Sequence, residues 1–437
     1  MQEYLGIPQL HIQSGEGCWL YDTEGRRYLD GNASIWTNVH GHGDPDLNRA
    51  LYEQLEHVAH STWLGLSHPV GCRLMERLTA HAPKELTRVV FSDNGSTAVE
   101  IALKLCFQYW QLVGKPEKTS IVHMSGAYHG DTFGAMSVSD PSNFHKRFRN
   151  WLFPTHQFPA PICREYGGKV DAADYGPSLE ALEKRLKSEA QHTAGVIVEP
   201  SVQGASGMQL QPHGFLKELE TLCRRYDVLL IFDEVFVGFG RLGSLFVCQS
   251  EDVCPDLLCL SKGLAAGYLP LAATLTTETL YKAFLGPFSE HRTFFHGHTF
   301  TANPLGAAVA LKSLEKLEAL IASGQLAETI QKFATAIATT FEAHPNVREI
   351  RQRGLAAALD LYPGTAPTAL YPARERRGLH VCLAARRYGL LLRPLGDTLV
   401  IVPPLIIQPP EIEHLIESLL KAMRKVLETP LKGADVR

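Results

Sequence analysis

Short apolar runs alternate along much of the chain with stretches in which apolar side chains recur at helical spacing. The runs lack polar alternation, which is typical of strands buried on both faces. Between them, residues 97–110 and 178–191 each place leucine, isoleucine or alanine side chains on one helical face. This order predicts an α/β fold in which helices cover both faces of a mostly parallel sheet. The candidate strands are residues 88–91, 120–123, 194–198, 228–232 and 256–260.

The pattern changes in the last third of the chain. A long helical pattern begins near Asn303 and leads out of the central sheet, and mixed strands and helices follow from about residue 343. Candidate strands there are 354–361, 389–393 and 398–402, a closing helix spans 410–428, and the proline-containing stretch 365–377 is typical of a loop. We expect a large domain over 61–320, a smaller α+β domain over 321–437, and an N-terminal segment, 1–60, that joins the small domain.

Composition and charge narrow the class of partner. The 437 residues are 45% hydrophobic and carry a formal net charge of −4, with acidic and basic residues mixed along the length. No basic face for nucleic acid is indicated, so small molecules are the expected partners. The nine cysteines are scattered without a Cys-x-x-Cys pair, which suits a reducing cytoplasm. We find no charged-then-apolar leader and no apolar run of about 18 residues, so we expect a cytoplasmic location without a membrane span.

The most informative residues are a lysine and an aspartate that each follow a predicted strand. Lys262 lies in Asp256-Leu-Leu-Cys-Leu-Ser-Lys-Gly, and the run Val228-Leu-Leu-Ile-Phe ends on Asp233 and Glu234. An amine at the end of one strand and a carboxylate at the end of another suit pyridoxal phosphate (PLP), because the lysine can form a Schiff base with the aldehyde while the acid keeps the pyridine nitrogen protonated. A buried carboxylate must in any case meet a cation or a proton. The alternatives are a salt bridge at a strand end and an ordinary surface lysine.

A candidate phosphate site opens the helix after the first of these strands. In Ser92-Asp-Asn-Gly-Ser-Thr the amides of Gly95, Ser96 and Thr97 would stand free at the helix start, where an anion is favoured. A helix cap without a ligand is the alternative.

A tyrosine and a histidine that follow the predicted strand at 120–123 complete the expected cofactor pocket. Tyr128, in Ala127-Tyr-His-Gly-Asp-Thr-Phe-Gly-Ala-Met, could stack on a flat pyridine ring. His129 beside it is either a hydrogen-bonded structural group or a catalyst. The histidines elsewhere lack the spacing of metal ligands, so no metal is expected.

Two arginines are candidates for binding a substrate carboxylate. Arg393 ends a predicted strand in Leu390-Leu-Leu-Arg-Pro-Leu-Gly, and Arg241 follows Gly238-Phe-Gly. Arginine suits bidentate capture of a carboxylate, although either could equally form a structural ion pair. The segment His296-Gly-His-Thr-Phe-Thr supplies a further loop of the phosphate-binding type ahead of a helix.

Together these motifs resemble the class III, fold type I, PLP-dependent aminotransferases, from Gly15 to about Pro404. The general resemblance lies in Asp233-Glu-Val, Gly-Phe-Gly-Arg241 and Ser-Lys262-Gly. Within the class, the chain is similar to the branch that converts 8-amino-7-oxononanoate to 7,8-diaminononanoate in biotin synthesis. That likeness rests on the segments 34–42, 128–136, 296–300 and 393–396.

The resemblance implies a role for each residue and a homodimer with shared active sites. Thr299 would reach the phosphate from the neighbouring subunit, Trp36 would line the substrate pocket, and Arg393 would hold the carboxylate of the keto acid. The remaining roles are Lys262 as the Schiff-base lysine and proton carrier, Asp233 on the pyridine nitrogen, Tyr128 against the ring, and Gly95 and Ser96 on the phosphate.

Departures from the family pattern bear on the amino donor, which would be S-adenosylmethionine or lysine. Ile35-Trp36 and Val400 stand where S-adenosylmethionine-using members carry a tryptophan pair and a tyrosine, which resembles the lysine-using branch. Phe236-Val237 replaces a common Ala-Thr and predicts a narrower pocket. The family's N-terminal aromatic element is not recognised, and Tyr4 is a candidate substitute. The competing hypotheses are another class III ω-amine aminotransferase, of the diamine or ornithine type, and a scaffold that retains the fold without activity.

Overall fold

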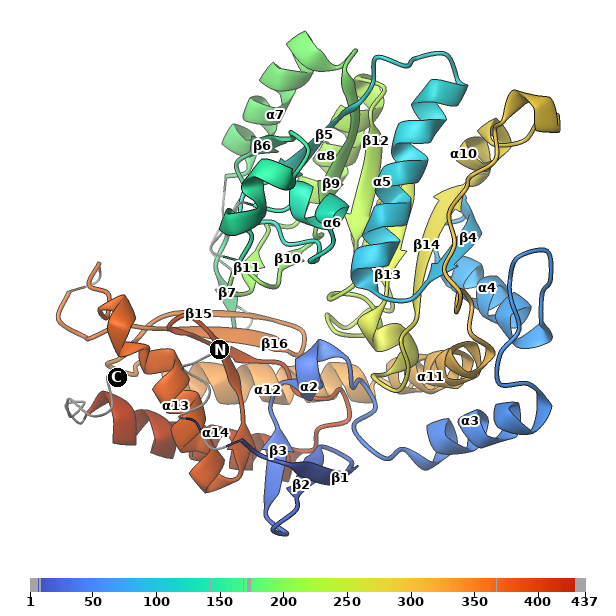
Figure 1. Ribbon diagram of the computed structural model, residues 1–437. Helices are drawn as coiled ribbons and strands as arrows, with labels where there is room; N and C mark the ends of the chain where they lie inside the picture. The colour runs from blue at the N-terminus through green and yellow to red at the C-terminus, as the bar shows by residue number, and fades with distance from the viewer. Residues whose placement is uncertain are drawn as a thin grey trace.

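The computed structural model describes residue 7 and residues 9–140, 144–167, 169–170, 174–366 and 368–428, with Val170 described by its backbone alone. Tyr4, the candidate N-terminal aromatic residue, lies outside this part of the chain. Figure 1 shows a large sheet with its helices above, and a second group of strands and helices below it.

A seven-stranded sheet forms the upper part of the molecule (Figure 1). β14 pairs antiparallel with both of its neighbours, β4 and β13, whereas the other pairings are parallel. The predicted α/β class and the mostly parallel sheet are therefore confirmed, and β14 and the short β6 were not predicted. In spatial order the strands are β4 (Leu86–Ser92), β14 (Ala272–Thr277), β13 (Leu257–Leu260), β12 (Leu229–Asp233), β9 (Thr193–Val198), β5 (Ser120–Met124) and β6 (His156–Phe158).

Successive residues of the central strands enter two different cores, because strand side chains alternate between the faces. In β12, Leu229 and Ile231 pack with α5 (Gly95–Leu112), while Leu230 and Phe232 pack in the core on the opposite face. That second core includes α4 (Pro69–His81), α7 (Gly176–Glu189) and α8 (Phe215–Arg225). This double burial explains why the strands read as continuous apolar runs.

The lower part is built on an antiparallel four-stranded sheet, ordered β15 (Val347–Arg353), β16 (Ala356–Leu361), β19 (Thr398–Ile401) and β18 (Arg393–Leu395). The helix α11 (Pro304–Ala322) leads from the large sheet into this part, as the sequence pattern indicated. Its own helices are α12 (Gln325–Phe341), α13 (Arg377–Ala385) and α14 (Pro409–Leu427). Of these, α14 was predicted as the closing helix.

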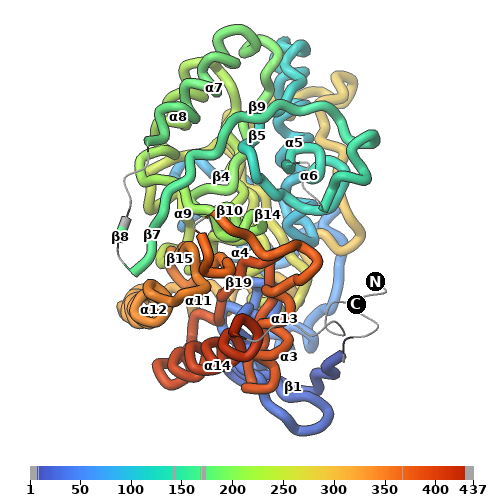
Figure 2. The backbone as a smooth tube through the Cα atoms, turned by 90° about the vertical axis from the view of Figure 1, so that its left-hand side faces the viewer, coloured from blue at the N-terminus to red at the C-terminus, as the bar shows by residue number. Residues whose placement is uncertain are grey.

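The N-terminal strands join the C-terminal part of the chain. β1 (Ile12–Glu16), β2 (Trp19–Asp22) and β3 (Arg27–Asp30) form a meander, and β17 (Leu390–Leu391) pairs with β3 in parallel. In both views β1 lies near α13 and α14 (Figures 1 and 2). This pairing is consistent with the predicted division into 1–60, 61–320 and 321–437, which stays a prediction.

The predicted strand at 389–393 is split between two sheets. Leu390 and Leu391 pair with β3, whereas Arg393 pairs with Val400 of β19. The chain therefore changes sheets at Leu392, and this change brings Arg393 beside the N-terminal segment.

Among the described residues, no helix has the length and apolar character needed to cross a membrane.

Short elements complete the described chain. The short elements are α2 (Ala33–Trp36), α3 (Pro45–His57), α6 (Phe133–Ser137), η1 (Lys146–Trp151), β7 (Glu165–Tyr166), β8 (Lys169–Val170), β10 (Val202–Gln203), β11 (Gln209–Leu210), α9 (Val247–Ser250), η2 (Lys262–Ala265), α10 (Glu278–Ala283), η3 (Phe288–Glu290), η4 (Ala373–Glu375) and η5 (Arg386–Tyr388).

Candidate active site

A cavity of about 630 Å³ lies at the carboxyl ends of the parallel strands, where ligands bind in open α/β sheets. Residues that follow β4, β5, β9, β12 and β13 line it, together with Ile35, Trp36 and Thr37 from the N-terminal segment and Arg393, Leu395 and Val400 from the small sheet. Of the residues predicted for the site, Lys262, Asp233, Tyr128, Gly95, Ser96, Trp36 and Arg393 line the cavity, and Thr97, Thr299 and Arg241 do not.

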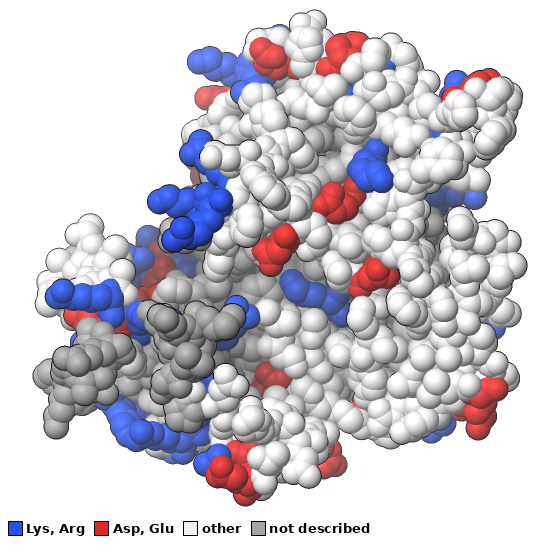
Figure 3. All heavy atoms as spheres, in the orientation of Figure 1, with Lys and Arg blue, Asp and Glu red and all other residues white. Residues whose placement is uncertain are grey.

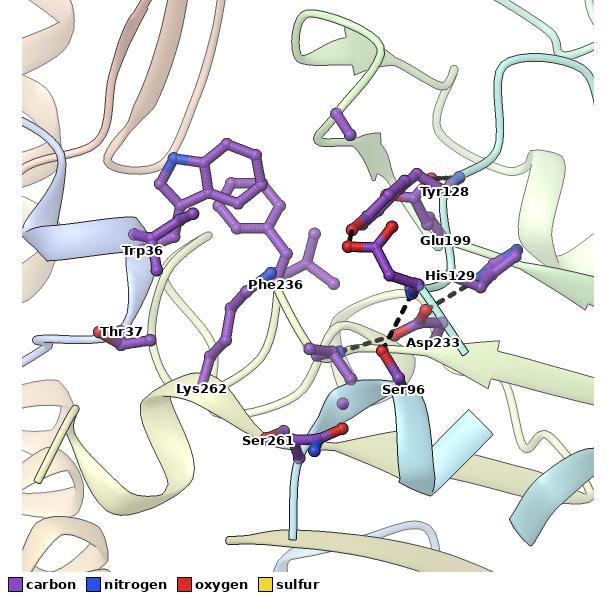
Figure 4. Close-up of a pocket in the computed structure, with 18 of the residues that line it drawn as sticks. Trp36, Thr37, Ser96, Tyr128, His129, Glu199, Asp233, Phe236, Ser261 and Lys262 are labelled. Carbon is purple, nitrogen blue, oxygen red and sulfur yellow. Dashed lines mark hydrogen bonds and ion pairs between the residues drawn. The ribbon is translucent and has the colours of Figure 1, made fainter. Parts of the chain in front are cut away.

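Lys262 enters the cavity directly after β13, at the start of η2. Its φ of 43° lies in the left-handed region, so local packing must hold its backbone in place. The Nζ atom lies 4.8 Å from the ring centroid of Trp36 and 5.7 Å from that of Phe236 (Figure 4). Removal from water lowers the pKa of the Lys262 amine, while Asp233 and Glu199 oppose that shift. A lowered pKa increases the neutral fraction, which is the nucleophilic form.

Asp233 is held at the end of β12 by two hydrogen bonds. Its Oδ2 atom lies 2.8 Å from Nδ1 of His129, and its Oδ1 atom accepts a 3.0 Å bond from the backbone N–H of Val235. Both side chains are buried, and the Nε2 atom of His129 has no hydrogen-bond partner among the described residues. The sequence left the role of His129 open between structure and catalysis, and the structure places it as the hydrogen-bond partner of Asp233.

Glu234, the second acid of the pair, points elsewhere. Its two carboxylate oxygens accept bonds of 2.6 and 2.8 Å from the N–H groups of Val247 and Cys248, at the start of α9. The side chain is fully buried, and burial raises its pKa to about 7. Of the two adjacent acids, Asp233 therefore lines the cavity and Glu234 does not.

Glu199 is a cavity residue that the sequence reasoning missed. It follows β9 and accepts bonds of 3.0 Å from the N–H groups of Tyr128 and Gly204. Burial raises its pKa to about 7; the proximity of His129 opposes that rise and the Asp233 carboxylate adds to it. The signal was present in the sequence, because an acid ends this apolar strand as Asp233 ends β12.

Tyr128 forms part of the opposite wall from Lys262 (Figure 4). Its hydroxyl donates a 2.9 Å bond to Asp131, and its ring stacks on His145 with centroids 5.6 Å apart and an interplanar angle of 20°. Burial raises the pKa of the phenol, so this side chain stays neutral. The expected contact with a cofactor ring stays a prediction.

The start of α5 provides two of the three predicted phosphate donors. Gly95 and Ser96 line the cavity at the first turn of an 18-residue helix, where backbone N–H groups lack partners within the helix. Thr97 is instead engaged in a capping box, since its N–H donates to Asn94 Oδ1 at 3.1 Å and its hydroxyl accepts from the N–H of Asn94. A Cβ atom on Gly95 would lie only 2.6 Å from Val235 Cγ1, so glycine permits this close approach to the Asp233 segment.

Trp36 and Arg393 face the cavity from the segments outside the large sheet. The Trp36 ring packs on Phe236 with centroids 4.7 Å apart, and Phe236 and Val237 both line the cavity beside it. Arg393 is exposed at the start of β18. The large Phe236 side chain thus lies next to Lys262, and the narrower pocket that the sequence predicted stays a prediction.

Arg241 lies outside the cavity. It is fully buried, and one guanidinium nitrogen, Nη1, donates to the carbonyls of Leu355 and Pro403 at 3.1 and 2.6 Å. Burial lowers its pKa to about 9, and the nearby Asp30 opposes that shift. The structure therefore gives Arg241 a buried structural place outside the cavity lining, and Arg393 is the predicted arginine that lines the cavity.

Thr299 is exposed in the connection between η3 and α11. A contribution from this residue to a neighbouring subunit stays a prediction.

The donor set fits PLP. A buried carboxylate, an amine of lowered pKa and free amides at a helix start meet in one cavity, and these groups match the pyridine nitrogen, the aldehyde and the phosphate.

Comparison with known proteins agrees with this geometry. The family Aminotransferase class-III matches residues 3–423. A relative from Geobacter sulfurreducens, named adenosylmethionine-8-amino-7-oxononanoate aminotransferase, is 48% identical over 428 residues, which cover 98% of this chain and 94% of the relative.

Two solved structures share the fold. The adenosylmethionine-8-amino-7-oxononanoate aminotransferase of Methanocaldococcus jannaschii has a TM-score of 0.92 at 35% identity and covers 97% of this chain and 95% of its own. An amine transaminase from an uncultivated Pseudomonas species, solved in a PLP-bound form, has a TM-score of 0.87 at 32% identity. The match covers 96% of this chain and 95% of the transaminase. The predicted family and fold type are confirmed. This chain belongs to the class III aminotransferases, PLP-dependent enzymes that move an amino group from a small-molecule donor to a keto acid.

Proposed function

We propose that this enzyme transfers an amino group to 8-amino-7-oxononanoate and forms 7,8-diaminononanoate, a step of biotin synthesis. The observation that carries the proposal is that Arg393 and Lys262 share one cavity whose lining is largely apolar. An acid with a long aliphatic chain matches that arrangement, because its carboxylate can pair with the guanidinium while the chain lies on apolar side chains. The names of the relatives from Geobacter sulfurreducens and Methanocaldococcus jannaschii support the same substrate.

Bound PLP supplies the electron sink that stabilises negative charge at the carbon next to the transferred nitrogen. In our proposal Lys262 holds the cofactor covalently, Asp233 holds its ring nitrogen, and the N–H groups of Gly95 and Ser96 bind its phosphate. Tyr128 lies against the ring. His129 keeps Asp233 oriented through their 2.8 Å hydrogen bond.

Lys262 also carries the proton in each half of the reaction. Its amine is the basic group that lies nearest to Trp36 and Phe236 in the cavity, and its lowered pKa places more of it in the neutral form at physiological pH. General-base transfer by a positioned side chain contributes about 10² to 10⁴-fold in rate. Because Trp36 and Phe236 cover the amine on one side, they also limit the access of water to it.

The amino donor in this proposal is lysine or S-adenosylmethionine. Ile35 and Val400 line the cavity at the two positions where the chain departs from S-adenosylmethionine-using members. Both are aliphatic, whereas those members carry an aromatic side chain at each position. This favours lysine.

We infer a homodimer in which Thr299 serves the partner's cofactor phosphate. The support lies in the segment around Thr299, where Phe288, Phe295 and Phe300 are 82%, 70% and 58% exposed. Large exposed aromatics in one connection are typical of a protein interface. We also propose a cytoplasmic location, supported by nine free cysteines that suit a reducing compartment.

A second candidate is transamination of another ω-amine. The amine transaminase from the uncultivated Pseudomonas species shares the fold over 96% of this chain, which favours this alternative. Adding single amines to the holoenzyme and following its visible spectrum separates the two candidates, because only a true donor converts bound PLP to pyridoxamine phosphate.

The direct test incubates the purified holoenzyme with 8-amino-7-oxononanoate and either lysine or S-adenosylmethionine. We expect 7,8-diaminononanoate, detected by mass spectrometry, with at least one donor. Absence of product with both donors, from an enzyme that still exchanges amino groups with other amines, would refute the proposed substrate and favour the second candidate.

A further inference from the structure

The turn that carries Trp36 has a backbone conformation that residues other than glycine rarely adopt. Ala33, Ser34 and Trp36 have φ values of 44°, 60° and 69°. Such conformations persist only where surrounding groups hold them in place, and they concentrate at functional sites. The turn forms one wall of the cavity through Ile35, Trp36 and Thr37.

A buried carboxylate holds the first half of this turn. Asp30, at the end of β3, accepts a 3.1 Å bond from the N–H of Asn32 and a 2.6 Å bond from the N–H of Ser34. Its Oδ2 atom also lies 2.9 Å from Nε2 of His42. Asp30 is 2% exposed, so these three donors replace the water that its charge has lost.

His42 links the same carboxylate to the second half of the turn. Its Nδ1 atom lies 3.3 Å from the side-chain nitrogen of Asn38, and Asn38 accepts a 2.7 Å bond from the hydroxyl of Thr37. The chain of bonds therefore runs from Asp30 through His42 and Asn38 to Thr37, the residue next to Trp36. Both ends of the strained turn are tied to the Asp30–His42 pair.

Asn32 extends the network to the carboxylate-binding side of the cavity. In the orientation that satisfies both ends of its side-chain amide, the oxygen accepts a 2.5 Å bond from the N–H of Arg393 and the nitrogen donates to the carbonyl of Val400 at 3.0 Å. Asn32 is itself held by Asp30. One turn therefore sets the positions of both Trp36 and the Arg393 backbone.

We propose that the Asp30–His42 pair is a positioning device that holds this turn so that Trp36 covers Lys262. Neither residue lines the cavity, so both act through the turn. Without the His42 bond, one donor to a buried carboxylate is lost and the turn can relax out of its left-handed conformation. Trp36 then no longer packs on Phe236 over the amine, and the substrate loses one wall of its site.

The kinetic test rests on the proposed function, and it is a double-mutant cycle between His42 and Trp36. We expect His42→Ala and Trp36→Ala each to lower kcat/KM for 8-amino-7-oxononanoate about tenfold, and the double variant to fall no further than Trp36→Ala. His42→Gln should recover most of the loss, because its amide N–H can still donate to Asp30. If the two losses multiply in the double variant, His42 does not act through Trp36 and the proposal fails.

A second readout does not depend on the substrate. The emission of Trp36, taken as the difference between each protein and its Trp36→Phe counterpart, should be quenched by bound PLP in the wild type and in His42→Gln, and clearly less in His42→Ala. Equal visible absorbance per subunit shows that each protein is loaded. Unchanged quenching in His42→Ala would overturn the proposal.

Controls separate the possible failures. His57→Ala alters an exposed histidine at the end of α3 and should change neither readout. If His42→Ala does not fold, Asp30→Asn, which keeps the side-chain size, takes its place with the same expectations. If the quenching differs as expected but the wild type does not convert 8-amino-7-oxononanoate, the proposed substrate is wrong and the positioning role stands.

Discussion

His129 and Asp233 form a buried pair in which Nδ1 lies 2.8 Å from Oδ2. One residue follows β5 and the other ends β12, so the pair ties together the ends of two strands that lie on either side of β9 in the large sheet. Because a donated N–H stabilises the charged carboxylate, this contact keeps Asp233 suited to a protonated ring nitrogen. We therefore infer that the role of His129 is to hold the Asp233 carboxylate in position.

Replacement of His129 by alanine should weaken the enzyme through Asp233. A buried carboxylate that loses a donor costs about 1–3 kcal/mol, so we expect kcat to fall about 10- to 100-fold and the affinity for PLP to decrease. His129→Asn is the matched control, because its amide nitrogen can stand near the position of Nδ1 and retain most activity. Steady-state kinetics and PLP titration of both variants check this, and equal losses in the two would contradict the assigned contact.

Removal of Arg393 should act mainly on the keto acid. Loss of a charge-assisted hydrogen bond is worth about 1.5–3 kcal/mol, so Arg393→Ala should raise KM for 8-amino-7-oxononanoate about 10- to 100-fold with a smaller effect on kcat. The effect on an uncharged amine donor should be slight.

Arg387→Ala is the control for Arg393, because Arg387 is exposed on η5 away from the cavity lining. Arg393→Lys should recover part of the loss, since it keeps the charge but not the bidentate geometry. An unchanged KM in Arg393→Ala would show that the carboxylate binds elsewhere.

Glu199 should make the stability of the protein depend on pH. Its pKa is raised from the ordinary 4.5 to about 7 by burial, so the folded protein keeps a proton that the unfolded chain releases between these values. The stabilisation by Glu199 is therefore fully present below about pH 4.5, and its contribution to the free energy of unfolding falls by about 1 kcal/mol per pH unit as the pH rises towards 7.

Urea unfolding of the holoenzyme at several pH values measures this slope. Glu199→Gln cannot titrate, so its decline over the same window should be shallower than that of the wild type. Glu218→Gln, an exposed change on α8, should keep the wild-type slope. A Glu199→Gln slope equal to the wild type would mean that this carboxyl does not hold its proton in the folded state.

The large sheet was largely predictable because the burial of each strand is visible in the sequence of that strand alone. Double burial leaves continuous apolar runs, so β4, β5, β9, β12 and β13 could be read from the sequence, and strand ends then located Lys262 and Asp233. β14 was missed because five of its six residues are alanine or threonine, which lack the bulk of the residues in the other strands, although all but the last are buried.

The contacts across the site could not be predicted, because they depend on how distant segments meet. Asp30 lies in none of the motifs, and His42 ends the segment 34–42 without a role that the sequence could assign, because the role of both depends on the strained turn between them. Arg241 was a reasonable carboxylate ligand by residue type, yet it is buried outside the cavity lining and donates to the carbonyls of Leu355 and Pro403. Glu199 could have been found by applying the strand-end argument to β9 as well as to β12.

The account depends most on the assignment of the cofactor to Lys262. Borohydride reduction of the holoenzyme, followed by proteolysis and mass spectrometry, should find one phosphopyridoxyl group on the peptide that contains Lys262, and Lys262→Ala should lose both this adduct and the visible absorbance of bound PLP. An adduct on another lysine, or an unmodified Lys262 peptide from an active and fully loaded enzyme, would contradict the account.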